Sequence, residues 1–102
     1  MTNMHDKLER VVLQAVGNDY EEFEMIVHDA TKWMSRIGEG PEIGQVEYAL
    51  MKCIADRNIK AYEYSESACQ FISTDADPKK INTLWFYITE NGKKRLELLD
   101  TI

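Results

Sequence analysis

The chain has 102 residues, which fits a single domain spanning residues 1–102, because two domains would each have too small a core. Its residues are 44% hydrophobic and 29% charged, with five glycines and two prolines, a composition that excludes a disordered chain. The formal net charge of −6 opposes generic binding of nucleic acid over the whole surface.

Three amphipathic helices are predicted in the first part of the chain. Apolar residues recur at three- and four-residue spacing over residues 6–16, 20–37 and 42–58. Asp19 is expected to cap the second helix, and the Gly- and Pro-containing stretch that follows that helix ends it. Asn58 is a suitable left-handed terminator for the third helix.

Strands are predicted in the second part of the chain. Residues 59–64 and 84–88 are short and rich in aromatic and apolar side chains, as strands are. Residues 68–73 either continue the first of these strands or form another. Residues 74–80 have the composition of a turn.

The end of the last strand predicts a tightly packed helix start. Phe86 and Ile88 alternate with other residues and are expected to be buried. Thr89 is expected to turn the chain and cap the final helix, while Gly92 allows close packing of its first turn. Farther along that helix, the residues expected to face inward are Leu96 and Leu99, and those expected to face outward are Lys93, Lys94 and Arg95.

The order of helix, helix, helix, strand, long turn, strand and helix resembles that of winged helix-turn-helix domains. Residues 46–61 resemble a recognition helix that leads into the first strand of a wing. Residues 86–96, Phe-Tyr-Ile-Thr-Glu-Asn-Gly-Lys-Lys-Arg-Leu, resemble the exit from the wing in PadR-like and MarR-like transcriptional regulators. The resemblance implies an α+β fold with three helices, a β-hairpin wing and a short C-terminal helix.

The resemblance also implies a homodimeric transcriptional regulator that binds duplex DNA with its third helix in the major groove. Carried onto this chain, the reading positions are Gln45, Tyr48 and Lys52, which share an exposed side of the third helix. A glutamine can read adenine, and tyrosine and lysine can hold phosphate. From 41 to 58, however, two basic residues stand against three acidic ones, a net charge of −1.

Positive charge is concentrated late in the chain. Residues 79–102 carry five Lys/Arg against three Asp/Glu, whereas residues 1–78 carry seven against fifteen. Lys79 and Lys80 are expected at the tip of the wing, where they would contact DNA. The remaining predicted phosphate contacts are Lys93, Lys94 and Arg95 at the start of the last helix.

A second function stays open, in which a winged-helix domain binds another protein and no DNA. The net charge and the acidic stretch at 19–24 favour it, although such a stretch also suits the positive end of a helix dipole. Four strand aromatics are not all expected to be buried, because neighbours on a strand face opposite sides of the sheet, and an exposed apolar patch would mark a dimer or partner surface. These residues are Tyr62, Tyr64, Trp85 and Tyr87.

Neither catalysis, nor a metal, nor a cofactor is expected. No Ser-His-Asp, Cys-His or His-Glu-x-x-His arrangement and no Gly-rich phosphate loop is present in the sequence. Cys53 and Cys69 do not form a Cys-x-x-Cys pair, and we expect two reduced, partly buried thiols. No stretch approaches the ~20 apolar residues of a membrane span, and a cytoplasmic location is expected.

Overall fold

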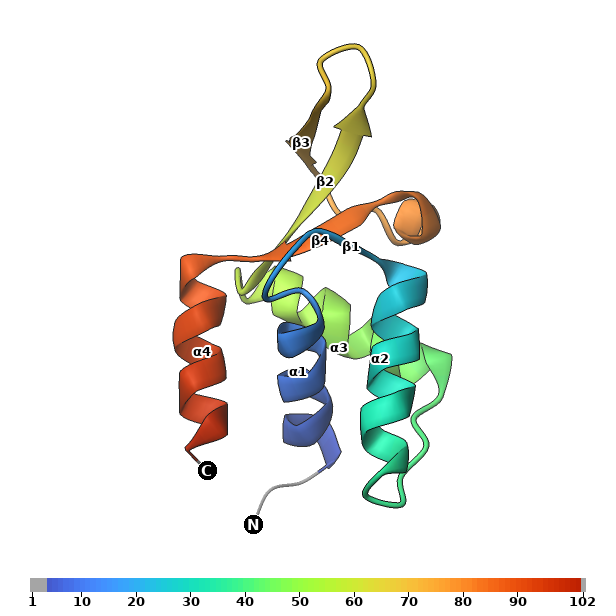
Figure 1. The fold of residues 1–102 in the computed structure, drawn as a ribbon, viewed down its shortest axis with the longest axis vertical. Coiled ribbons are helices and arrows are strands. Elements are labelled where there is room, and N and C mark those ends of the chain that lie inside the picture. Colours follow the sequence, from blue (N-terminus) through green and yellow to red (C-terminus); the bar gives the residue numbers. More distant parts are fainter. Residues whose placement is uncertain (1–3, 102) are drawn as a thin grey trace.

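The computed structural model describes residues 4–101, which form an α+β fold (Figure 1). The helices are α1 (Met4–Ala15), α2 (Phe23–Ser35), α3 (Ile43–Ala55) and α4 (Glu90–Asp100). The strands are β1 (Glu21–Glu22), β2 (Ile59–Ser65), β3 (Gln70–Thr74) and β4 (Trp85–Ile88), joined in the order β1-β4-β2-β3 in an antiparallel sheet. A 3-10 helix, η1 (Pro78–Thr83), connects β3 to β4.

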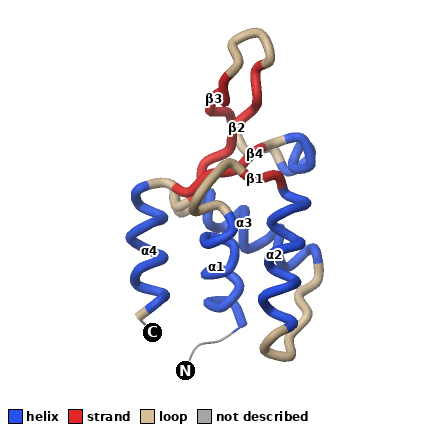
Figure 2. The backbone as a smooth tube through the Cα atoms, viewed as in Figure 1, coloured by secondary structure: helices blue, strands red, loops and turns tan. Residues whose placement is uncertain are grey.

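Helices α1, α2 and α4 stand side by side, and the sheet lies across one end of this layer (Figure 1). Helix α1 is central, since it packs against each of the other α-helices. The β2–β3 hairpin projects away from the helices, as the tube view shows (Figure 2), and the long axis of the fold measures 47 Å. This arrangement of helices and antiparallel strands is compatible with a winged-helix-like topology.

The core lies between the helices and one side of the sheet. Its most completely buried large side chains include Leu13 of α1, Ile26 of α2, Leu50 of α3 and Phe86 of β4. Phe86 and Ile88 are buried while their strand neighbours are half-buried, which confirms the predicted alternation. Hydrophobic burial from these elements is the main favourable contribution to folding.

The second helix begins later and ends earlier than predicted. Its first residue is Phe23, preceded by the N-cap residue Glu22, so the prediction that Asp19 caps the helix is wrong. Residues 21 and 22 instead pair with β4 as strand β1. Strand pairing satisfies backbone groups at the free edge of β4, and this tertiary contact overrides the local helical pattern.

One further expectation on local structure needs correction, and one open alternative is resolved. Helix α3 ends at Ala55, and Arg57, with φ of 63°, is the left-handed residue in place of Asn58. Of the two alternatives for residues 68–73, the separate strand is the one observed, because the chain turns at 66–69 and returns as β3. The tip of the projecting hairpin is therefore at 66–69.

Helix α4 begins as predicted, with Thr89 as its cap. The Thr89 hydroxyl accepts a hydrogen bond from the Gly92 N–H (2.9 Å) and donates one to the Arg57 carbonyl (2.7 Å). A Cβ atom at Gly92 would overlap the carbonyl oxygen of Asn58 and lie 2.7 Å from Cγ1 of Ile88. The predicted close packing at Gly92 is thus confirmed, and only glycine fits there.

Replacing Gly92 with alanine should therefore destabilise the fold by about 3 kcal/mol, because backbone must move to admit the methyl group. Gly44→Ala is the matched control: it lies in the first turn of α3 with open space around it. This control should leave stability unchanged or raise it by up to ~1 kcal/mol. Urea unfolding of both variants measures the difference, and equal effects would contradict the contact.

Candidate interaction surface

Helix α3 exposes both apolar and polar residues to solvent. Its buried side consists of Val46, Ala49, Leu50 and Cys53. The middle of the opposite side consists of Gly44, Tyr48, Met51 and Ala55. Met51 is half-buried against the core, and Gln45 and Lys52 are exposed beside these residues. Tyr48 is 65% exposed, and Ile43 at the start of the helix is 62% exposed. The centre of this outward side therefore carries no charge.

A shallow groove of about 540 Å³ adjoins the outward side of α3, between α2, α3 and η1. We call it the α2–α3 groove, and its lining residues are Phe23, Glu24, Val27, Ile43, Glu47, Ile81 and Asn82. Four of these residues are apolar, and the charged residues among them, Glu24 and Glu47, are both acidic. The groove thus pairs an apolar lining with negative charge.

The predicted DNA-reading residues Gln45, Tyr48 and Lys52 all lie on the exposed surface of α3. Each of them contacts another residue within the chain, and the ring centroid of Tyr48 lies 6.4 Å from that of His5. Oε1 of Gln45 accepts a hydrogen bond from the Glu42 N–H (2.8 Å) in a capping box. Nζ of Lys52 lies 3.2 Å from Nε2 of His5. Among the side chains that the structure describes, Tyr48 is the most exposed large hydrophobic one.

Lys79 and Lys80 lie in η1, and their predicted position at a wing tip is wrong. The Asp77 carboxylate accepts a hydrogen bond from the Lys79 N–H (3.0 Å), and Pro78 occupies the first turn. A capping aspartate followed by proline favours a helical turn over a strand end. Because η1 packs against α2 at one end of β4 and α4 follows the other end, these lysines are separated from those of α4.

The three basic residues of α4 differ in their interactions with the rest of the chain. Nε and Nη2 of Arg95 each donate a hydrogen bond of 2.9 Å to the Glu9 carboxylate, so the prediction that Arg95 faces outward is wrong. Lys93 forms an exposed ion pair with Glu90 (3.2 Å). Lys94 is exposed and has no hydrogen bond or ion pair to any residue within 4–101.

The Glu9–Arg95 pair is partly buried, and it joins two helices. Glu9 is 7% exposed and lies on α1, whereas Arg95 is half-buried on α4. The hydrogen bonds from Arg95 hold the pKa of Glu9 below its ordinary value, against the opposing effect of burial. The pair therefore fastens α4 to α1.

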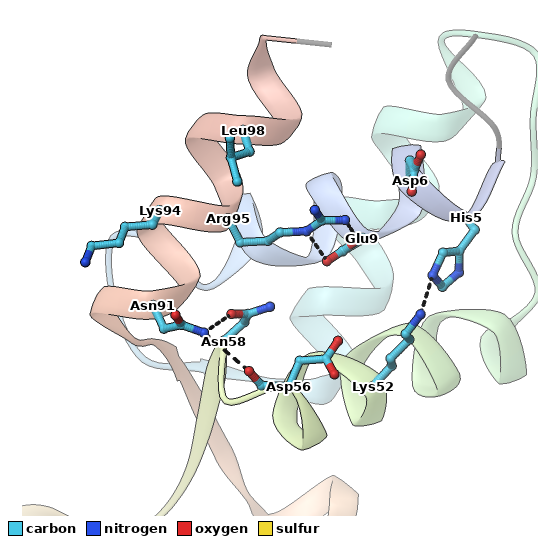
Figure 3. Close-up of a pocket in the computed structure, with 10 residues that line it drawn as sticks. All are labelled: His5, Asp6, Glu9, Lys52, Asp56, Asn58, Asn91, Lys94, Arg95 and Leu98. Carbon is cyan, nitrogen blue, oxygen red and sulfur yellow. Dashed lines mark hydrogen bonds and ion pairs between the residues drawn. The ribbon is translucent and has the colours of Figure 1, made fainter.

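The same pair lies in a polar cavity of about 430 Å³ formed by α1, the C-terminal end of α3 and α4 (Figure 3). Its lining residues are His5, Asp6, Glu9, Lys52, Asp56, Asn58, Asn91, Lys94, Arg95 and Leu98. Many of its polar groups bind one another, as in the hydrogen bond from Nδ2 of Asn91 to Oδ1 of Asn58 (2.7 Å). Lys94 points away from the cavity (Figure 3). The polar residues that line this cavity therefore serve mainly to hold α1, α4 and the end of α3 together.

The outer side of the sheet carries an aromatic cluster. The four aromatics noted in the sequence share this side because they alternate along β2 and β4, and Tyr64 remains 48% exposed. Tyr20 completes the cluster by stacking on Phe71 with 3.9 Å between ring centroids. The expectation that these aromatics face opposite sides of the sheet is wrong, because each pair is two residues apart on its strand. Nothing local identifies Tyr20, which the helical pattern assigned to the second helix.

The two thiols have different environments. Cys53 is buried, and burial raises its pKa to about 12, so the thiol stays protonated at neutral pH. Cys69 is exposed at the hairpin turn with φ of 52°, so the expectation of a partly buried thiol is wrong for it. Cys53 is consequently a packing residue.

No protein-family model, curated protein or solved structure matches the chain. No helix within the described part of the chain is long and apolar enough to cross a membrane. Residues 4–101 hold no group of three or more His, Cys, Asp or Glu side chains suited to a metal ion.

Glu9→Gln should lower the free energy of unfolding by about 2 kcal/mol at neutral pH, because Arg95 loses a charged acceptor. The folded-state pKa of Glu9 is depressed. Its stabilisation is thus present above the unfolded pKa of about 4.3 and is lost as pH falls through the folded pKa. Denaturant unfolding from neutral to acidic pH should show the wild type and the variant converging at low pH.

Asp100→Asn is the control for this prediction, since it removes the exposed Arg10–Asp100 pair (2.6 Å). An exposed pair contributes only up to ~1 kcal/mol. If both variants lost the same stability at neutral pH, the conclusion that the Glu9–Arg95 pair stabilises the fold more than an exposed ion pair would be wrong.

Proposed function

We propose that this chain is a winged-helix-like domain that binds a protein partner through α3 and the α2–α3 groove. The observation that carries the proposal is the charge of the elements that would meet DNA in such a domain. Residues 42–77, which contain α3 and the β2–β3 hairpin, carry three Lys/Arg against seven Asp/Glu, a net charge of −4. Phosphates repel such a surface.

Two features support the winged-helix assignment in this proposal. Strand β1 lies between α1 and α2 in sequence and pairs with β4, which then pairs with β2. The exit from β4 through Thr89 and Gly92 has the packing expected of a wing-to-helix exit. On this assignment α3 corresponds to the recognition helix and β2 to the first wing strand.

The chemistry of the surface indicates the kind of partner. Exposed tyrosine and aliphatic groups suit protein interfaces, whose cores are enriched in aromatic residues and methionine. Tyr48 and Ile43 supply such groups, and Glu24 and Glu47 line the adjoining groove. A protein segment with an apolar anchor flanked by Lys or Arg complements this arrangement.

A photo-crosslinking residue in place of Tyr48 tests the proposal in cells that express the chain. The crosslinking residue at position 48 should yield a discrete protein adduct. The same crosslinking residue in place of Thr31, which is exposed on α2, should yield none. Reversing the groove charge with Glu24→Lys and Glu47→Lys should weaken the adduct by about tenfold.

Glu97→Lys is the matched control, because Glu97 is exposed on α4, away from the groove lining. It should leave the position-48 adduct unchanged. Equal labelling from positions 48 and 31, or an adduct indifferent to the groove charge, would count against this surface.

A DNA-binding regulator acting as a homodimer is the second candidate. Lys79, Lys80 and Lys94 favour it, because they are exposed and make no ion pair within residues 4–101. Fluorescence anisotropy with a mixed-sequence duplex at two salt concentrations separates the candidates. The protein-binding proposal predicts no binding at low salt. Salt-dependent binding that Lys79→Glu with Lys80→Glu abolishes would establish the DNA candidate instead.

A further inference from the structure

The two edges of the sheet differ in how well they are protected against pairing with a strand of another chain. At one edge, β1 is two residues long and both are glutamates, features that discourage pairing with another chain. At the other edge, β3 has five residues, Gln-Phe-Ile-Ser-Thr, without a charge or a proline. Within residues 4–101, β3 pairs with β2 alone. Its outer side therefore offers unpaired backbone donors and acceptors.

The position of β3 makes this outer edge accessible. The β2–β3 hairpin stands clear of the helical layer (Figure 1). Ile72, at the middle of the strand, is 47% exposed. An uncharged edge strand with an exposed aliphatic residue at its centre is a template for strand addition.

We infer that β3 pairs with β3 of a second copy of this chain, antiparallel and centred on Ile72. A two-fold axis through this position places Ile72 opposite its own counterpart, because an isologous interface repeats the same contacts. The flanking pairs are then Gln70 with Thr74 and Phe71 with Ser73. Each pair is uncharged, so no like charges face one another.

A second copy fits this edge because the strand is complementary to itself. Two residues lie on each side of Ile72 in β3, so both ends of the strand are paired when two copies meet at this position. Ile72 then gains an aliphatic neighbour, and the acidic residues next to β3 in sequence lie outside the paired segment. The resulting sheet is continuous across both copies. The surface of α3 and the α2–α3 groove contain no residue of β3, so this inference does not depend on the proposed function.

The test measures mass in solution by sedimentation as a function of concentration. The wild type should reach twice the monomer mass. Ile72→Lys should remain a monomer because it places two like charges together at the axis. Glu63→Lys is the matched control, since Glu63 lies directly opposite Ile72 on β2 and does not reach the shared edge. It should dimerise as the wild type does.

Disulfide trapping tests the register independently, in a Cys69→Ser background. Ile72→Cys should give an intermolecular disulfide under mild oxidation. Ser73→Cys should not, because strand geometry places the two equivalent Cα atoms about 8 Å apart, beyond the ~7 Å reach of a disulfide. A wild type that stays monomeric, an Ile72→Lys variant that dimerises normally, or equal trapping at 72 and 73 would each overturn the inference.

Discussion

The fold depends on the contact between the first turn of α4 and the connection that joins α3 to β2. Gly92 lies so close to the Asn58 carbonyl that a methyl group would overlap it. That carbonyl also accepts a hydrogen bond from the Thr89 N–H (3.0 Å), and the Asn58 N–H donates to the Cys53 carbonyl (2.8 Å). Helix α4 is therefore tied to the end of α3, and β4 is held between β1 and β2. Arg95 holds the same helix to α1, so α4 is anchored both to α1 and to the connection between α3 and β2.

The sequence predicts the regular elements because their periods of 3.6 and two residues are strong. It predicts the cap at Thr89 and the packing at Gly92 because both follow from local backbone chemistry. It does not predict β1, since two glutamates carry no strand signal and pair only because β4 offers them an edge. Nor does it predict the Glu9–Arg95 pair, whose members are 86 positions apart. Long-range contacts of this kind also decide which basic side chains remain free for a partner.

The fold of this chain resembles that of DNA-binding domains, but its charge does not favour DNA. The arrangement of helices and strands is compatible with a winged-helix-like topology, whereas the segment carrying α3 and the hairpin has a net charge of −4. The pKa of Glu21 is raised by its burial and by neighbouring carboxylates, which reflects the acidic surroundings where α2 begins. In a winged-helix domain that binds DNA, α3 approaches phosphates. Here, glutamates line the groove beside α3, and the middle of its outward side is uncharged. That combination suits a basic protein segment with an apolar anchor.

The most direct test of this account follows the backbone amide signals of α3 by nuclear magnetic resonance during two titrations at low salt. One titrant is a basic peptide with apolar anchors, and the other is a mixed-sequence DNA duplex. We expect the peptide to shift the amides of Ile43, Glu47 and Tyr48, with little change on α4, and the duplex to shift none of them. Shifts of the α3 amides by the duplex and not by the peptide would contradict the account.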